Sequence, residues 1–232
     1  MKLYFSPGAS SFAPLILVHE LGKKAKLEKV DLREKKLASG KDYRAVNPKG
    51  YVPALETKKG EIYTEIPIIL QYLADKAGAT KLLPKAGSKA RYHALEMLNF
   101  VAAELHKTYS PMFNPAMPEE GKAAMKQRVA LRLSYLNDVL GKQPFVSGKH
   151  FGVADCYAYT VLSWSGSVGV DLSAYPNVAK YVELMAKRPS VIAAKKAEAT
   201  AFEALKKKAE AAARKAETKK AASEKKAETA AA

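Results

Sequence analysis

The sequence predicts an α/β domain followed by an all-α helical bundle. Strand and helix patterns alternate over roughly the first 77 residues, strand signals end near residues 82–85, and later segments repeat apolar residues at helical spacing. A chain of 232 residues that is 48% hydrophobic can bury a substantial core. We therefore expect domains at 1–80 and 87–202, with a separate tail at 203–232.

The first domain reads as short strands around amphipathic helices. Pro14 falls in the first turn of the first helix, where a missing N–H costs least, and Gly22 ends that helix. Gly60 supplies a hairpin turn. The expected elements are strand 2–6, helix 12–21, strand 27–31, strands 52–56 and 61–63, and helix 65–77. This order is that of a thioredoxin-like unit.

The second domain shows apolar spacing near 3.6 in four segments, which predicts a helical bundle. Leu133, Leu136 and Leu140 illustrate the spacing. The expected helices are 88–108, 119–140, 153–168 and 176–187.

Composition excludes several classes of protein. No run approaches 18 apolar residues, so the sequence predicts no membrane span, and the first residues do not resemble a secretory signal. A single cysteine, Cys156, cannot form an internal disulfide, which is typical of a reducing compartment. We therefore expect a cytoplasmic protein. The net charge of +16 attracts polyanions or acidic surfaces in general.

The tail at 203–232 differs from the rest of the chain. It holds nine Lys/Arg and five Glu, and beyond Leu205 no apolar residue is larger than Ala. Such a segment favours helix but has no apolar seam to bury, so it is not a coiled coil. It is either a marginal solvated helix, a disordered extension, or a tail that contacts polyanions.

The most informative motif is NPKGYVPAL at 47–55, followed by Thr64-Glu65 at the start of a helix. Pro53 donates no hydrogen bond, so Val52 would offer its backbone as an edge, and a cis Val52–Pro53 bond would suit the turn. Glu65 would lie where helix-terminal N–H groups and a carboxylate can hold the charged end of a peptide. An ordinary turn-to-helix connection is the alternative interpretation.

Taken together, these motifs resemble bacterial, beta-class-like glutathione transferases over residues 1 to about 200. The resemblance implies a thioredoxin-like domain, a helical domain and a homodimer. It also implies conjugation of glutathione, as co-substrate, to a small hydrophobic electrophile. No metal is expected, because the sequence shows no metal-ligand spacing. The matching pieces are MKLYFSPGAS, VNPKGYVPAL, TE with QYLAD, LNFVAAELHK, FGVADCYAYTVLSW and RPSV.

The resemblance also implies site residues. Val52 and Pro53 would meet the cysteinyl part of glutathione, Glu65 and Ile66 the γ-glutamyl end, and Lys35 the glycyl end. From the helical domain would come Asn99, Ala103, Glu104, Leu105 and His106, with His106 nearest the sulfur. The electrophile would lie beside Tyr109, Met112, Phe113 and Trp164.

Two positions depart from the family pattern. Ser10 stands where beta-like members carry a cysteine, so a mixed disulfide with glutathione is excluded at that residue. Ser10 or Ser11 can still donate a hydrogen bond to a thiolate, with His106 assisting by hydrogen bond or charge. Ile66 replaces a small residue and removes a hydroxyl contact. These departures motivate the alternative of a non-catalytic protein that binds nucleic acid or an acidic partner.

Structural roles compete for several of these residues. Ser10 and Ser11 are also N-cap candidates for the first helix, Lys35 is also an ordinary solvated lysine, and His106 is also a structural histidine. Cys156 is expected to be a buried core thiol rather than a nucleophile. Asp155, three residues after Gly152, is expected to cap a helix and so to serve folding.

Overall fold

The computed structural model describes residues 1–207 and 211, and it contains a five-stranded sheet at its N-terminal end. The strand order is β3-β2-β1-β4-β5. β1 pairs with β2 in parallel, while the β1–β4, β4–β5 and β2–β3 pairs are antiparallel. The strands are β1 (Lys2–Phe5), β2 (Lys26–Asp31), β3 (Lys36–Leu37), β4 (Ala54–Glu56) and β5 (Ile62–Thr64).

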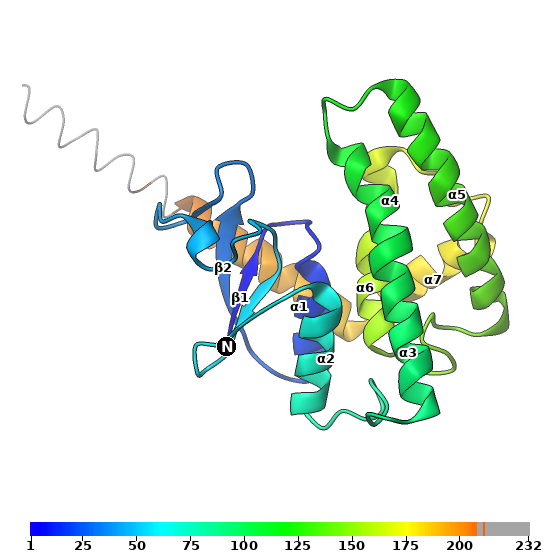
Figure 1. Cartoon of the computed structure of the whole chain (residues 1–232), viewed down its shortest axis with the longest axis horizontal. Coiled ribbons are helices and arrows are strands. Elements are labelled where there is room, and N and C mark those ends of the chain that lie inside the picture. Colours follow the sequence, from blue (N-terminus) through cyan, green and yellow to red (C-terminus); the bar gives the residue numbers. More distant parts are fainter. Residues whose placement is uncertain (208–210, 212–232) are drawn as a thin grey trace, which may run out of the picture.

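Helices α1 (Phe12–Glu20) and α2 (Ile66–Lys76) pack against each other beside the sheet (Figure 1). Side chains alternate across a strand, so Leu3 joins the large core with α1 and α2 while Tyr4 joins a smaller core with Tyr43. The sheet is therefore covered on both faces, and the predicted α/β architecture is confirmed.

The rest of the described chain is helical, as predicted. The helices are α3 (Lys89–Phe100), α4 (Lys107–Tyr109), α5 (Glu119–Lys142), α6 (Val153–Leu162) and α7 (Pro176–Ala186). A further helix over residues 189–207 runs back beside the sheet and α1, as the orange ribbon of Figure 1 shows. Its contacts include Phe202 beneath the Lys29 ammonium and a bidentate pair between Arg188 and Glu20 at its start.

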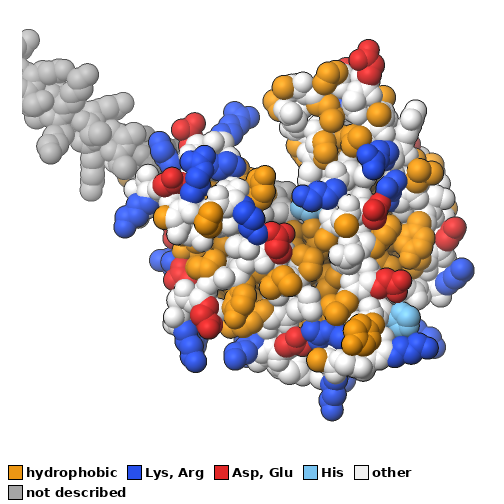
Figure 2. Space-filling model, in the orientation of Figure 1, with side chains coloured by type: hydrophobic (Ala, Val, Ile, Leu, Met, Phe, Trp, Pro, Cys, Tyr) orange, Lys and Arg blue, Asp and Glu red, His pale blue; other side chains and the backbone are white. Residues whose placement is uncertain are grey.

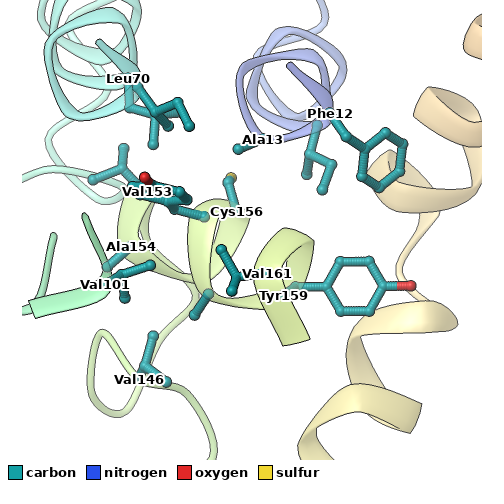
Figure 3. Close-up of a cluster of buried hydrophobic side chains, with 14 of the residues drawn as sticks. Phe12, Ala13, Leu70, Val101, Val146, Val153, Ala154, Cys156, Tyr159 and Val161 are labelled. Carbon is teal, nitrogen blue, oxygen red and sulfur yellow. The ribbon is translucent and has the colours of Figure 1, made fainter. Parts of the chain in front are cut away.

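Helix α6 is the centre of the helical domain, because all ten of its residues are buried. It packs against α1, α2 and α3. Figure 3 shows Cys156 on this helix close to Ala13 of α1. The prediction that Cys156 is a core thiol is confirmed, and its burial raises the thiol pKa well above its ordinary value.

Two helix boundaries predicted from the sequence were wrong. The helix expected over 88–108 changes at Val101 into a π-helix that ends at His106, and the helix expected over 153–168 ends at Leu162. Helix 189–207 was not expected as a separate element. The predicted tail begins within it at Glu203 and otherwise lies outside the described residues.

Candidate active site

A cavity of about 690 Å³ opens between the sheet domain and the helical domain. Figure 2 shows a hollow between the two lobes, with Lys and Arg side chains on both sides of it. The cavity gathers eight of the predicted site residues: Ser10, Lys35, Val52, Pro53, Glu65, Ile66, Ala103 and His106. Sequence positions nearly 100 residues apart therefore meet in one cleft.

Ser10 and the Val52–Pro53 bond form one wall of the cleft. The peptide bond is cis, as predicted. The Ser10 hydroxyl lies 3.0 Å from the Val52 carbonyl oxygen and donates to it. Because β4 begins only at Ala54, the backbone of Val52 is left outside the sheet ladder. The wall thus presents a backbone edge next to a hydroxyl at the start of α1.

Two strained backbone positions lie on the same cleft. Among the described residues, Lys35 and Glu65 are the two non-glycine residues with positive φ, at 55° and 65°. A side chain in this region costs roughly 1–3 kcal/mol, so the surrounding structure must hold it there. Such strain clusters at functional sites. Lys35 and Glu65 were also predicted as site residues from the sequence, on grounds other than backbone strain.

The charges of the cleft favour an anionic ligand that carries one cationic group. The lining residues carry three positive charges, those of Lys35, Lys49 and Lys107, and one negative charge, that of the Glu65 carboxylate. Glu65 forms an ion pair with Lys49, and Lys49 also donates to the Thr64 hydroxyl at 3.0 Å. Glu65 directly precedes α2, where Pro67 has no N–H and the Ile68 and Ile69 amides donate to the Glu65 carbonyl, so among the described residues the Ile66 amide is the free donor of that helix end.

His106 faces the cleft from the end of the π-helix. Its Nδ1 lies 2.6 Å from the Tyr157 hydroxyl, and its ring meets the Trp164 ring edge-on, with centroids 5.1 Å apart. Burial lowers the pKa of His106 to about 4, with a smaller contribution from the Lys107 charge. Burial also raises the pKa of the Tyr157 hydroxyl. Both groups are therefore neutral at pH 7.

The loop that precedes Ser10 is held from two sides. Trp164 donates its indole N–H to the carbonyl of Gly8 at 2.9 Å, and the Gly8 amide donates to Glu198 of helix 189–207 at 3.1 Å. Gly8 has a φ of 71°, a conformation that glycine adopts without strain. The helical domain therefore fixes the position of the loop.

Comparison with known proteins shows similarity over nearly the whole described chain. Residues 10–76 match the family model "Glutathione S-transferase, N-terminal domain", and residues 100–189 match "Glutathione S-transferase, C-terminal domain". The chain is 42% identical to glutathione S-transferase GstA of Escherichia coli O157:H7, over 85% of this chain and 98% of that protein.

The chain belongs to the glutathione S-transferase family.

Solved structures agree with this assignment. A sphingomonad glutathione S-transferase complexed with glutathione is 44% identical, with a TM-score of 0.82 over 86% of this chain and 99% of that chain. A beta-class glutathione S-transferase of Sphingomonas chungbukensis is 43% identical, with a TM-score of 0.82 over 85% of this chain and 98% of that chain. The predicted transferase family and fold are thus confirmed.

Four predicted site residues of this transferase lie outside the cleft. Ser11 is buried, and its hydroxyl bonds to the backbone of Ser6. Leu105 belongs to the core, and Glu104 points to Arg132 at the surface. Asn99 is exposed on α3 and does not line the cleft. The turn of the helix directs Asn99, Glu104 and Leu105 away from the cleft.

Of the two N-cap candidates, Ser10 lies before the N-cap position of α1, and its hydroxyl donates to Val52 instead. Ser11 occupies the N-cap position of α1 but makes no side-chain cap hydrogen bond.

The predicted electrophile residues divide into two groups. Tyr109 and Met112 are buried in the core, and the Tyr109 hydroxyl bonds to Ser165. Phe113 is half exposed, and its ring meets Trp164 edge-on at 5.6 Å. Phe113 and Trp164 therefore extend the surface beside His106, whereas Tyr109 and Met112 only support it.

Sequence reasoning missed several lining residues of this transferase. The motif NPKGYVPAL at 47–55 contains Asn47, Lys49 and Tyr51, and the motif FGVADCYAYTVLSW at 151–164 contains Tyr157. Lys107 follows His106 directly. Their motifs carried the signal, but only the folded geometry shows which side chains of each motif face the cleft.

Proposed function

We propose that this transferase binds glutathione in the cleft and transfers its thiolate to a small hydrophobic electrophile. The observation that carries the proposal is the convergence of a backbone edge at Val52 that lies outside the sheet ladder, a strained acidic residue at Glu65 and a neutral imidazole at His106. Relatives with this fold are named as glutathione transferases, which favours catalysis over the non-catalytic alternative.

The tripeptide fits the polarity of the cleft in one direction. Its γ-glutamyl end carries an ammonium and a carboxylate, which match the Glu65 carboxylate and the N-terminus of α2. Its cysteinyl amide matches the backbone of Val52. The glycyl carboxylate then lies toward Lys35. Each charged group of glutathione meets a group of opposite charge.

We assign activation of the glutathione thiol to Ser10 and to the N-terminal end of α1. In the free protein the Ser10 hydroxyl donates to the Val52 carbonyl. When the cysteinyl N–H of glutathione takes that carbonyl, the hydroxyl is released and can turn to the sulfur. A free thiol has a pKa near about 8.5, so a donor and the positive end of α1 both favour the reactive thiolate.

His106 assists as a neutral donor rather than as a cation. We assign the protonated Tyr157 hydroxyl as the donor to Nδ1, 2.6 Å away, an assignment that leaves the imidazole proton on Nε2, available to the sulfur. The earlier alternative of assistance by charge does not agree with a pKa of about 4. Hydrogen bonding is the remaining role.

Other consequences of family membership stay predictions. They are the homodimer, the cytoplasmic location, a role in detoxification and the choice of a hydrophobic electrophile beside Phe113 and Trp164. Among the described helices none is both long and apolar enough to cross a membrane.

Calorimetry with glutathione tests binding directly, and the Glu65→Gln variant tests the assigned site. We expect the substitution to weaken glutathione affinity by roughly 10- to 100-fold, because the ammonium of the ligand loses a charged acceptor. Glu183 is exposed on α7 and far from the cleft residues in sequence, so Glu183→Gln is the matched control. Equal affinity in both variants would show that glutathione is held elsewhere.

Conjugation of an activated chloronitrobenzene then tests catalysis. Retention on heparin without any conjugation, at saturating glutathione, would instead support the non-catalytic alternative.

The pH profile of kcat/KM tests the state of His106. A pKa of about 4 means that the imidazole has already lost its proton above pH 5, so activity from pH 5 to 8 should follow only the ionisation of the thiol and rise with pH. We expect His106→Asn to lower kcat about tenfold while leaving the shape of the profile unchanged. A falling limb near the ordinary histidine pKa, present in the wild type and absent in the variant, would show a cationic role.

A further inference from the structure

A second cavity, of about 580 Å³, lies away from the transferase cleft and shares none of its lining residues. It forms where the end of α1, the β4–β5 hairpin and the end of α2 meet beside Met1, near the N-terminus marked in Figure 1. Its size is that of a typical small-molecule site. Three separate elements therefore build a pocket that the transferase reaction does not use.

The pocket combines a cationic rim with an aromatic wall. Five lysines line it against a single carboxylate, that of Glu61: Lys23, Lys24, Lys58, Lys59 and Lys76. In the described part of the chain none of these lysines forms a salt bridge. Tyr63 and Tyr72 stack with ring centroids 4.4 Å apart and form the wall, which Leu21 and Leu73 extend.

Part of this charge has an ordinary folding role. Lys23 and Lys24 follow α1, and Lys76 ends α2, where the negative end of the helix dipole favours cations. Lys58 and Lys59 lie in the hairpin turn and have no such helix end beside them. These two exposed lysines add like charge to a rim that is already cationic, which strengthens the positive potential that attracts an anion.

We propose that this pocket binds a nucleoside polyphosphate, with the phosphates on the lysine rim and the base against the tyrosine wall. Lysine ammonium groups suit phosphate oxygens as point charges, and an aromatic wall suits a planar base. A purely inorganic polyphosphate would leave the wall unused, and an uncharged ring would leave the rim unused. A volume of about 580 Å³ matches a small molecule better than an extended nucleic acid strand.

Titration with ATP in the absence of Mg²⁺ tests the proposal, read out by calorimetry and by backbone NMR shifts at the hairpin. The variant Lys58→Gln/Lys59→Gln should weaken ATP binding roughly tenfold, the loss expected for two exposed charge contacts. The control Lys142→Gln/Lys149→Gln removes the same charge from exposed positions outside the pocket and should bind as the wild type does.

A second variant separates the ring from the phosphates. Tyr72→Leu should weaken ATP but leave tripolyphosphate binding unchanged, because only the base contacts the wall. No ATP binding, equal loss in the lysine variant and its control, or tighter binding of a short single-stranded oligonucleotide than of ATP would each overturn the proposal. Glutathione conjugation should be unchanged in all of these variants, so failure here does not bear on the transferase function.

Discussion

Replacing Asp155 by alanine is expected to lower the free energy of unfolding by about 3–5 kcal/mol. The carboxylate is completely buried. It accepts from the backbone amides of Val146 and Gly152, both at 2.9 Å, and from the Tyr181 hydroxyl at 3.1 Å. Alanine leaves these donors buried without an acceptor, and an unsatisfied buried donor is expensive.

The same bonds explain why this residue serves folding rather than catalysis. Asp155 joins the start of α6 to the segment before it through Val146 and to α7 through Tyr181. Gly152 begins the helix without a side-chain oxygen, so the Asp155 carboxylate supplies the side-chain bond of the capping motif. Burial raises the pKa of Asp155 to about 6, so the group is ionised at pH 7.

Thermal unfolding followed by circular dichroism measures this effect. A loss of this size corresponds to a fall in Tm of roughly 10 °C for a chain of this length. Asp138→Ala is the matched control, because Asp138 is exposed on α5 and should change stability by less than about 0.5 kcal/mol. Asp155→Asn should fall between them, since its amide oxygen still accepts. Equal Tm values for the alanine variant and the wild type would contradict the role.

The fold was largely predictable because its signals are local. Helical periodicity marks the helices, and the Pro53 and Gly60 positions mark the turns of the first domain. The π-helix at Val101–His106 has no local signal, because its apolar residues fit an ordinary helix equally well. Its carbonyls at Glu104 and Leu105 accept from the Thr108 hydroxyl, a bond that only the structure reveals.

The candidate site was predictable by motif but not by orientation. The motif residues Glu104 and Leu105 were assigned together with Ala103 and His106, yet only the last two face the cleft. Along a helix, neighbouring residues point in different directions, so a motif that contains ligand contacts also contains residues that do not touch the ligand. The second cavity was not predictable at all, since its lysines come from three separate segments.

Replacing Ser10 by cysteine is expected to create a thiol that forms a mixed disulfide with glutathione. Ser10 lines the cleft at the start of α1, where the positive end of the helix lowers the pKa of a cysteine. With oxidised glutathione, the new thiolate attacks one sulfur, the mixed disulfide forms, and one glutathione leaves as a thiolate. Mass spectrometry should find one added glutathionyl group on the variant.

The wild-type protein should gain no such group under the same conditions. Its single cysteine, Cys156, is completely buried and has a raised pKa, so it is neither accessible nor nucleophilic. The background of the experiment is therefore close to zero. Excess reduced glutathione should remove the group from the variant, because exchange is reversible.

The neighbouring position supplies the matched control. Ser11 is equally close to the start of α1, but its side chain is turned into the protein toward Ser6. Ser11→Cys should therefore remain unmodified while Ser10→Cys reacts. If the two variants reacted alike, the sulfur of glutathione would not be directed to position 10, and its assigned place beside Val52 would be wrong. If only Ser10→Cys reacts, the hydroxyl of Ser10 is the protein group next to the thiol, and its release from the Val52 carbonyl on binding becomes the step to measure.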